Sequence, residues 1–305
     1  MRVFCDMVGH RDLAYSIYAL FHNRLGCSVS FAGGQPEEWL SNSVACEPMD
    51  HELIPSECYV GLEEFNDTTY DVCIATCHHG ELGLFRLCQR NSNKGMFVRQ
   101  IANLAEVPVV AKHAMMAMLH DQLLPDGCNT VHYIPEHPPY FQPMPEGGSK
   151  HSRIAHFNWY SNNTNEAKGI IASVSRELPD LSIVGREFMP QEEMAEWMNS
   201  SMAYLHIKSA GSCGFTLREA LFSGIPVAVN LSWSKAYQTP AYKYLVDGVN
   251  CVDLCELRRP IDRTAELLRE WVKGENYSER CSEALMKTRE LINFEHEAEK
   301  VKQWL

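Results

Sequence analysis

The sequence has 305 residues, enough for two domains of ordinary size, and its 45% apolar and 22% charged residues predict a folded, soluble chain. No apolar run is long enough for stable membrane insertion, and the early charges argue against a signal peptide. Twelve cysteines without a framework spacing predict reduced thiols and a cytoplasmic location. The net charge of −12 does not by itself favour nucleic acid as a partner.

Predicted strands and helices alternate through the first half, which is typical of a doubly wound α/β sheet. The predicted strands are residues 2–7, 27–32, 70–76, 107–111 and 131–134, and the predicted helices are residues 13–25, 97–106 and 114–124. Residues 35–67 are acidic, contain prolines and show little periodicity. Residues 135–148 are rich in proline and glycine, so we expect them to link two domains.

The second half repeats the alternation. The predicted strands are residues 153–159, 181–184, 203–207, 227–229 and 249–254, and the predicted helices are residues 165–177, 191–198, 215–222, 263–272 and 277–305. We therefore expect an N-terminal domain over 1–145, a C-terminal domain over 146–290, and a last helix over 291–305 that could cross back to the first domain. Ligands would bind in a cleft beyond the carboxyl ends of the strands.

The stretch 211–230 carries the strongest functional signal. A glycine-rich turn with Gly211 and Gly214 precedes a helix, and Glu219 lies one turn into it. The first N–H groups of such a helix lack intrahelical partners, and the helix dipole favours negative charge there. The pattern therefore predicts a site for an anionic phosphate.

Several motifs of the second half occur in the order known from one family. They are Phe141 with Pro143, the Glu-Ala-Lys-Gly run at 166–169, Leu-Pro at 178–179, LSIVG at 181–185, the segment 214–227, and YLVDGVN at 244–250. Together they resemble retaining glycosyltransferases of the GT-B fold, most closely glycosyltransferase family 4. The resemblance implies an α/β protein of GT-B architecture, with two Rossmann-like doubly wound domains facing each other across a cleft.

The resemblance also implies roles for single residues. Lys168 would pair with the donor diphosphate, Glu219 would accept hydrogen bonds from the donor ribose, and His113 would approach the transferred sugar. The glycine loop after the first strand, with Gly9 and His10, could approach the donor phosphates. The complete donor-binding set is Gly9, His10, Gly185, Arg186, Phe188, Met189, Ser212, Cys213, Gly214, Phe215, Thr216 and Leu217.

The sequence departs from the family pattern at three places. Gly211 stands where the family has a glutamate that contacts the sugar. The arginine that usually precedes the lysine is absent unless Arg153 or Arg186 substitutes for it. The first domain is also short, which suggests a simplified acceptor side.

No metal site is expected. The cluster of Cys73, Cys77, His78 and His79 matches no common zinc spacing, and no Asp-x-Asp pair occurs in the chain. The resemblance likewise implies catalysis without a metal or other cofactor, and with a nucleotide-diphosphate sugar as co-substrate.

The implied enzyme is a hexosyl- or pentosyltransferase that moves a sugar from a UDP- or GDP-sugar to an acceptor hydroxyl with retention. Four bases, Arg86, Arg90, Lys94 and Arg99, could meet an anionic acceptor, or they could form a solvated helix face. Two acceptors therefore stay open. One is a hydroxymethylated base in double-stranded DNA, as in phage-type DNA glycosyltransferases acting in the host cytoplasm. The other is a glycan or lipid-linked sugar.

Two rival classes also remain. One is a non-catalytic GT-B-like protein that binds a sugar nucleotide, which the replacement at Gly211 supports. The other is a sugar-nucleotide epimerase on the same fold, which would act on the donor without an acceptor.

Overall fold

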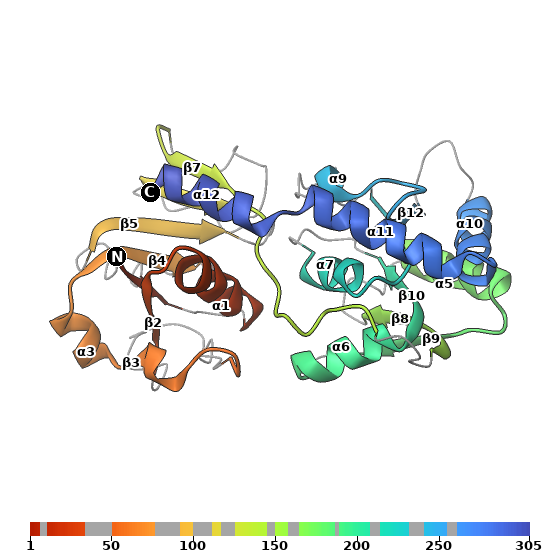
Figure 1. Cartoon of the computed structure of the whole chain (residues 1–305), viewed down its shortest axis with the longest axis horizontal. Helices are drawn as coiled ribbons and strands as arrows, with labels where there is room; N and C mark the ends of the chain where they lie inside the picture. Colours follow the sequence, from red (N-terminus) through yellow and green to blue (C-terminus); the bar gives the residue numbers. More distant parts are fainter. Residues whose placement is uncertain are drawn as a thin grey trace. The chain divides into compact units, whose positions relative to one another are not determined.

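The structure is a computed structural model that describes residues 1–6, 11–33, 51–76, 92–99, 112–116, 126–144, 150–157, 165–186, 189–207, 214–231, 241–254 and 261–305. The chain divides into two compact units (Figure 1). Unit 1 comprises Met1–Pro138 and Phe294–Leu305, and unit 2 comprises Pro139–Asn293. In the part of the chain that the structure describes, no helix is both long and apolar enough to cross a membrane.

The described strands of unit 1 form one parallel sheet in the order β3-β2-β1-β4-β5-β6-β7. They are β1 (Arg2–Cys5), β2 (Ser28–Ala32), β3 (Tyr59–Val60), β4 (Tyr70–Thr76), β5 (Ser92–Arg99), β6 (His113–Met116) and β7 (Asn129–His132). The described helices of unit 1 are α1 (Arg11–Tyr18), η1 (Ala19–Arg24), η2 (Ser56–Cys58), α3 (Leu62–Asp67) and α12 (Phe294–Trp304). The strand order reverses between β1 and β4, as in a Rossmann-like domain.

The first helix of unit 1 ends as the sequence predicts. The α1 helix continues as the π-helix η1, and the chain then turns at Gly26, whose φ of +65° suits glycine. Strand β2 follows and pairs with β1 in parallel register. Aromatic rings fill the layer beside these strands, where Phe4 lies 4.3 Å from Phe65 and 5.4 Å from Tyr70 between ring centroids.

The described strands of unit 2 form a second parallel sheet in the order β12-β11-β10-β8-β9. They are β8 (His151–Phe157), β9 (Ser182–Arg186), β10 (Ser201–His206), β11 (Val227–Val229) and β12 (Val252–Asp253). The described helices are α5 (Asn165–Glu177), α6 (Gln191–Asn199), α7 (Phe215–Phe222), α9 (Ala241–Tyr244), α10 (Ile261–Lys273) and α11 (Tyr277–Leu291).

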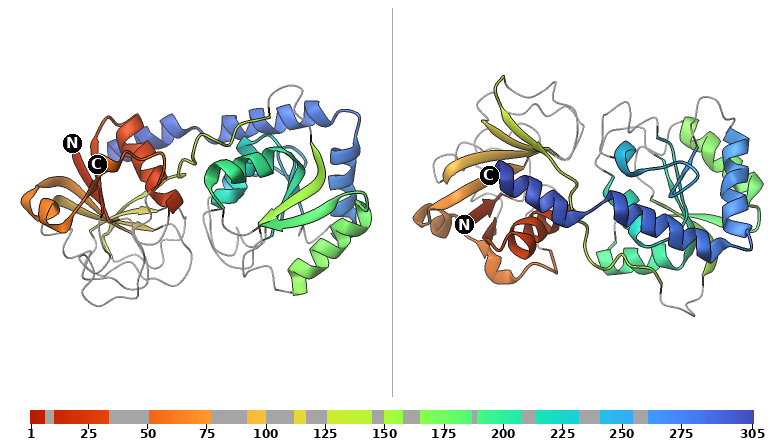
Figure 2. Two further views of the ribbon diagram at one scale, coloured as in Figure 1. Left: turned by 90° about the horizontal axis from the view of Figure 1, so that it is seen from below. Right: turned by 45° about the horizontal axis from the view of Figure 1, so that its top comes forward.

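Helices cover both faces of the sheet of unit 2 (Figure 2), and alternate residues of β10 point to opposite faces. Ala203 and Leu205 belong to a buried apolar cluster with Ile170 and Val174 of α5 and Leu268 of α10. The intervening residues of β10 point to the opposite face, where α6 and α7 contact each other. Both faces of the sheet are therefore covered by helices, as is usual for parallel sheets.

Three predicted helices differ from the structure in the described residues. Residues 97–99 end strand β5, and residues 114–116 lie in strand β6, although both segments were expected to be helical. Ala114 and Met115 are completely buried, and a strand covered on both faces lacks the alternation that distinguishes it from a buried helix. The predicted last helix is interrupted, because Ile292 is extended (φ −117°, ψ 101°) between α11 and α12. The predicted strand 107–111 lies outside the described residues.

Candidate functional site

The candidate site of unit 2 lies where the strand order of its sheet reverses. Strands β8 and β10 are parallel neighbours, yet β8 leads through α5 to β9 and β10 leads through α7 to β11 on the other side. The two connections diverge at the carboxyl ends of β8 and β10, which is where open α/β sheets bind ligands. The first turns of α5 and α7 flank this point.

Helix α7 begins at a left-handed glycine. Gly214 is its N-cap residue, with φ 72° and ψ 50°, and its carbonyl accepts the N–H of Arg218 at 3.2 Å. Only glycine adopts this backbone conformation without strain. The N–H groups of the following turn, at Phe215, Thr216 and Leu217, have no acceptors within the helix, so this end of α7 is suited to an anion.

Glu219 lies one turn into α7 and is 1% exposed. Its neighbour Arg218 is completely buried, and its guanidinium carbon lies 4.7 Å from the ring centroid of Phe215 at the start of the helix. Charged side chains are rarely buried to this degree, because desolvation is costly. The start of α7 therefore differs from an ordinary amphipathic helix that packs on a sheet.

Tyr204 of β10 lies beneath the start of α7. Its side chain is completely buried and hydrogen-bonded to the side chain of Thr216, and its oxygen lies 3.4 Å from Nδ1 of His206. Burial raises the pKa of the Tyr204 phenol, and the nearby Glu219 carboxylate raises it further, whereas the Thr216 hydrogen bond lowers it. Tyr204 is therefore a neutral phenol in a polar cluster that links the sheet to α7.

Sequence reasoning missed Tyr204 and His206. The signal was present in the AYLHI strand, where two polar aromatic residues alternate with three apolar ones. In a strand this spacing puts both polar rings on one face, which is the face that α7 covers.

Lys168 follows β8, and Gly185 lies near the carboxyl end of β9, the neighbour of β8. Lys168 is exposed and occupies the first turn of α5, which follows β8. Gly185 is exposed near the carboxyl end of β9, where Arg186 pairs in register with Phe157 of β8. Met189 is partly exposed just beyond, whereas Phe188, Gly211, Ser212 and Cys213 lie outside the described residues.

Arg153 does not supply the missing base. It lies near the amino end of β8, where its guanidinium donates to the carbonyl of Trp197 at 3.1 Å and to the hydroxyls of Ser200 and Ser201. This turn is at the opposite edge of the sheet from α7. Arg186 therefore remains as the basic residue whose backbone lies at the carboxyl edge.

His113 of unit 1 begins β6, at the amino end of that strand. Its half-buried ring packs edge-on against Trp304 of α12, with 6.0 Å between ring centroids. Ligand sites of parallel sheets lie at the opposite edge. The position of His113 thus fits packing of α12 better than contact with a transferred sugar.

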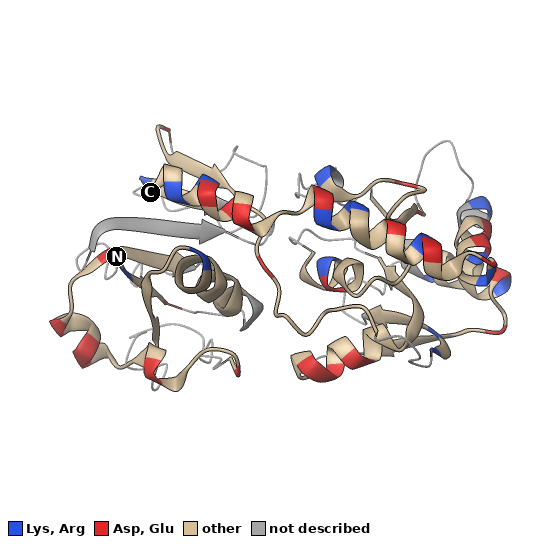
Figure 3. Ribbon diagram, in the orientation of Figure 1, with Lys and Arg blue, Asp and Glu red and all other residues tan. Residues whose placement is uncertain are grey.

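The described part of the basic run of unit 1 is a strand. Lys94 and Arg99 lie in β5, an interior strand between β4 and β6, so the interpretation as a solvated helix face is wrong for them. Arg86, Arg90, Gly9 and His10 lie outside the described residues, as do Cys77, His78 and His79. Acidic side chains are conspicuous on α3 of unit 1, with Glu63 and Glu64, and on α6 of unit 2 (Figure 3).

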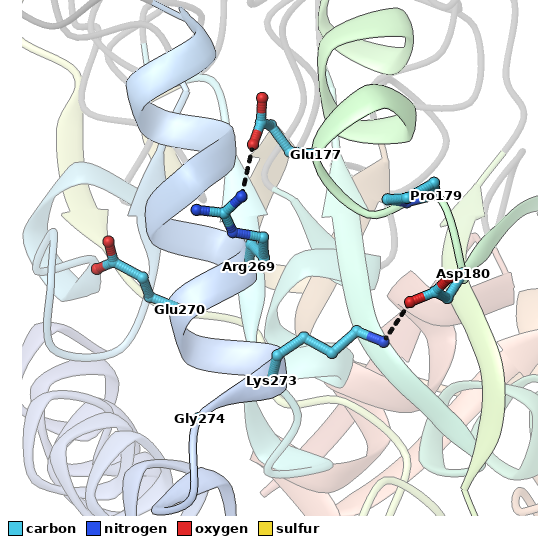
Figure 4. Close-up of a pocket in the computed structure, with 7 residues that line it drawn as sticks. All are labelled: Glu177, Pro179, Asp180, Arg269, Glu270, Lys273 and Gly274. Carbon is cyan, nitrogen blue, oxygen red and sulfur yellow. Dashed lines mark hydrogen bonds and ion pairs between the residues drawn. The ribbon is translucent and has the colours of Figure 1, made fainter.

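A surface hollow of unit 2 lies away from this site (Figure 4). It is lined by the ends of α5 and α10, where Arg269 pairs with Glu177 at 3.1 Å and Lys273 with Asp180 at 3.2 Å. Both basic groups are already neutralised, and the residues of α5 here precede the amino end of β9. The hollow is therefore a poor candidate for an anionic ligand. The described residues contain no group of three metal-binding side chains.

The sequence matches no protein-family model and no curated protein. The structure is similar to that of Anabaena Alr3699/HepE in complex with UDP-glucose, with a TM-score of 0.64 at 10% identity over 99% of this chain and 98% of that one. Sucrose-phosphate synthase from Thermosynechococcus elongatus gives a TM-score of 0.56 at 11% identity over the same shares.

TarM gives a TM-score of 0.53 at 12% identity over 80% of this chain, which spans only 55% of the TarM chain. Identities this low are informative about the fold alone. The parallel sheets of both units and these similarities agree, and the chain accordingly has the GT-B fold, with two Rossmann-like domains.

Proposed function

We propose that the protein is a glycosyltransferase that moves a sugar from a nucleotide-diphosphate donor to an acceptor hydroxyl with retention of configuration. The observation that carries this proposal is the start of α7. A left-handed glycine and a buried carboxylate one turn later stand at the switch point of the sheet in a GT-B fold. Neighbours of this fold were crystallised with UDP-glucose, in Anabaena HepE, and with UDP, in TarM.

The proposed chemistry needs stabilisation of a departing diphosphate. The N–H groups of Phe215, Thr216 and Leu217 would face its oxygens, and Lys168 in the first turn of α5 would add a positive charge. Glu219 would accept hydrogen bonds from the ribose hydroxyls. These residues would act without a metal or further cofactor.

The acceptor that we favour is the hydroxyl of a glycan or lipid-linked sugar. Acidic side chains on α3 and α6 would repel the DNA backbone (Figure 3). TarM was crystallised with the glycan fondaparinux as well as UDP. Hydroxymethylated DNA is the second acceptor that the same assay tests.

One assay separates these functions. The protein is incubated with UDP- and GDP-sugars, with saccharide acceptors, with hydroxymethylated DNA, or alone, and nucleotide release is followed. We expect release that depends on a saccharide. Release with DNA only would make the protein a DNA glycosyltransferase, and release without acceptor would indicate an epimerase or hydrolase. Binding without any release would leave a non-catalytic sugar-nucleotide-binding protein.

Two substitutions test the proposed residues. Lys168→Met should lower kcat roughly 100-fold, because the charge on the leaving group loses a partner. Glu219→Gln should weaken UDP binding about tenfold, because an uncharged amide accepts weaker hydrogen bonds from the ribose. Isothermal titration and initial rates measure both effects.

Lys287→Met is the matched control. Lys287 pairs with Glu290 on α11, far along the chain from the proposed site. Its loss should leave rate and affinity unchanged. Wild-type kcat in Lys168→Met would remove that residue from the proposal.

A further inference from the structure

Tyr204 occupies the centre of the sheet of unit 2. In the ladder it pairs with Val227 of β11 on one side and with Ala155 of β8 on the other. Its neighbours along the strand, Ala203 and Leu205, pack into the apolar cluster beneath α5 and α10. Its own side chain therefore points to the face that α7 covers.

A buried phenol on this face needs a hydrogen-bond partner. Tyr204 finds its partner in the side chain of Thr216, the second residue of α7. The Glu219 carboxylate lies close enough to act on it electrostatically, and His206 lies 3.4 Å away on the same strand. All of these groups are buried or partly buried, so their mutual geometry is fixed by packing.

A second tyrosine of unit 2 provides the contrast. Tyr277 of α11 donates its hydroxyl to the backbone carbonyl of Met202 in β10, at 2.9 Å, and not to a side chain of α7. That bond fastens a helix to the amino end of the strand and contacts no residue of the proposed site. A phenylalanine at position 204 would fill the core equally well, so packing alone does not account for the hydroxyl of Tyr204.

We propose that Tyr204 is a positioning residue of the donor site, whose hydroxyl fixes the first turn of α7 through Thr216 and orients the Glu219 carboxylate toward the donor ribose. This inference rests on the proposed function. Tyr204 itself has no exposed surface and would not touch the donor. Through Glu219, it would increase the preference of the site for nucleotides whose ribose carries both hydroxyls.

The proposed role of Tyr204 predicts how its loss changes the affinity for different nucleotides. Ribose hydroxyls are recognised by Glu219, whereas the diphosphate is recognised by the amides of α7 and by Lys168. Loss of the Tyr204 hydroxyl should therefore weaken binding of a ribonucleotide more than binding of its 2′,3′-dideoxy analogue. A merely structural role would weaken both alike.

The test is Tyr204→Phe, with dissociation constants measured by calorimetry for UDP, GDP and their 2′,3′-dideoxy analogues. We expect the preferred ribonucleotide to bind about tenfold more weakly, a loss equivalent to one buried hydrogen bond. The dideoxy analogue should change by less than about twofold, since it lacks the hydroxyls that Glu219 binds. Thr216→Val removes the partner hydroxyl and should reduce the ribose preference in the same direction, even if Tyr204→Phe fails to fold.

Tyr277→Phe is the matched control, because it removes one tyrosine hydroxyl that donates to β10 away from the proposed site, and it should lower Tm without altering any dissociation constant. An unchanged ratio of ribose to dideoxy affinity in Tyr204→Phe and Thr216→Val would overturn the inference while leaving the proposed function intact. Failure of the wild-type protein to bind UDP or GDP would overturn the proposed donor, and this inference with it.

Discussion

His156 is a buried histidine in the strand beside Tyr204. Only 4% of it is exposed, and its Nδ1 lies 2.9 Å from the carbonyl oxygen of Leu205 on β10. A carbonyl only accepts, so Nδ1 carries the proton of the neutral ring. Burial lowers the pKa of His156, and the hydrogen bond to Leu205 opposes that shift in part.

This environment makes stability depend on pH. Below the unfolded pKa of about 6.5, the unfolded chain binds a proton that folded His156 resists, so the free energy of unfolding should fall as pH falls. His156→Gln should cost about 1 kcal/mol at pH 7.5 through the lost hydrogen bond. Its stability should decline less than that of the wild type between pH 7.5 and 5.5, as measured by urea unfolding.

The exposed His151 on the same strand supplies the control. His151→Gln should retain the wild-type slope of stability with pH. Equal slopes in wild type and His156→Gln would mean that His156 is not the group responsible.

At the scale of single residues, the sequence predicted residues that belong to a local motif and missed residues whose neighbours come together only in the folded sheet. Glu219 was predicted because its spacing from the glycine turn is local. Tyr204 was not, because only the assembled sheet brings it beneath α7, the helix that carries Thr216 and Glu219. The sequence alone could not decide whether Arg153 or Arg186 replaces the absent arginine of the family. The direction of strand β8 decides this, because it places Arg153 at the amino edge of the sheet.

Among the elements, α7 depends on the conformation of its first residue. Gly214→Ala should cost about 1 kcal/mol, because a side chain is strained at a φ of 72°. The turn would relax and shift the amides of Phe215 to Leu217, so we expect UDP affinity to fall roughly tenfold. Calorimetric titration and urea unfolding measure the two effects.

Gly248→Ala is the control that separates the effect of backbone strain on stability from the effect of the α7 amides on UDP binding. Gly248 has a similar φ of 77°, and an added Cβ there would meet nothing within 4 Å. This variant should lose similar stability and keep its UDP affinity. If both variants bind UDP equally well, the amides of α7 do not hold the diphosphate.

Most elements could be predicted because amphipathic helices and strands bounded by glycine or proline have a local signal. Helix α5 begins and ends where its periodicity indicated, and strand β11 does as well. Strand β6 could not be predicted, since its adjacent residues Ala114 and Met115 are both buried and such a run resembles a buried helix. Strand β5 could not be predicted either, since its first half, Ser-Asn-Lys-Gly, has the composition of a loop. Their identity comes from pairing with β4 and β7.

At the scale of the whole molecule, Arg24 binds the two segments of unit 1 that lie directly before and directly after unit 2 in the chain. Its guanidinium donates to both carboxylate oxygens of Glu136, at 2.6 and 2.7 Å, just before the chain leaves unit 1. It also pairs with Glu295 and lies 5.8 Å from the ring of Phe294, just after the chain returns. Helix α12 is further held by Glu297, which is 8% exposed and accepts the N–H of Ile134 at 2.9 Å.

Arg24→Met should therefore loosen α12. Two carboxylates lose a partly buried partner, and we expect the free energy of unfolding of unit 1 to fall by about 2 kcal/mol. Amide hydrogen exchange over Phe294–Trp304 should accelerate more than exchange in β1. Lys302→Met is the control, since its pair with Glu299 is exposed, and exchange there should be unchanged. Equal exchange in both variants would show that Arg24 does not anchor the helix.

The return of α12 to unit 1 has a consequence for the order of events during synthesis. Ala298 and Val301 of α12 are buried, and the helix contacts β7 and η1, so unit 1 is complete only with this segment. Unit 2 is continuous in the chain, and the ribosome makes all of it before α12. Although domains usually fold in the order of their synthesis, here the second unit can finish first, while the first waits with an uncovered apolar surface.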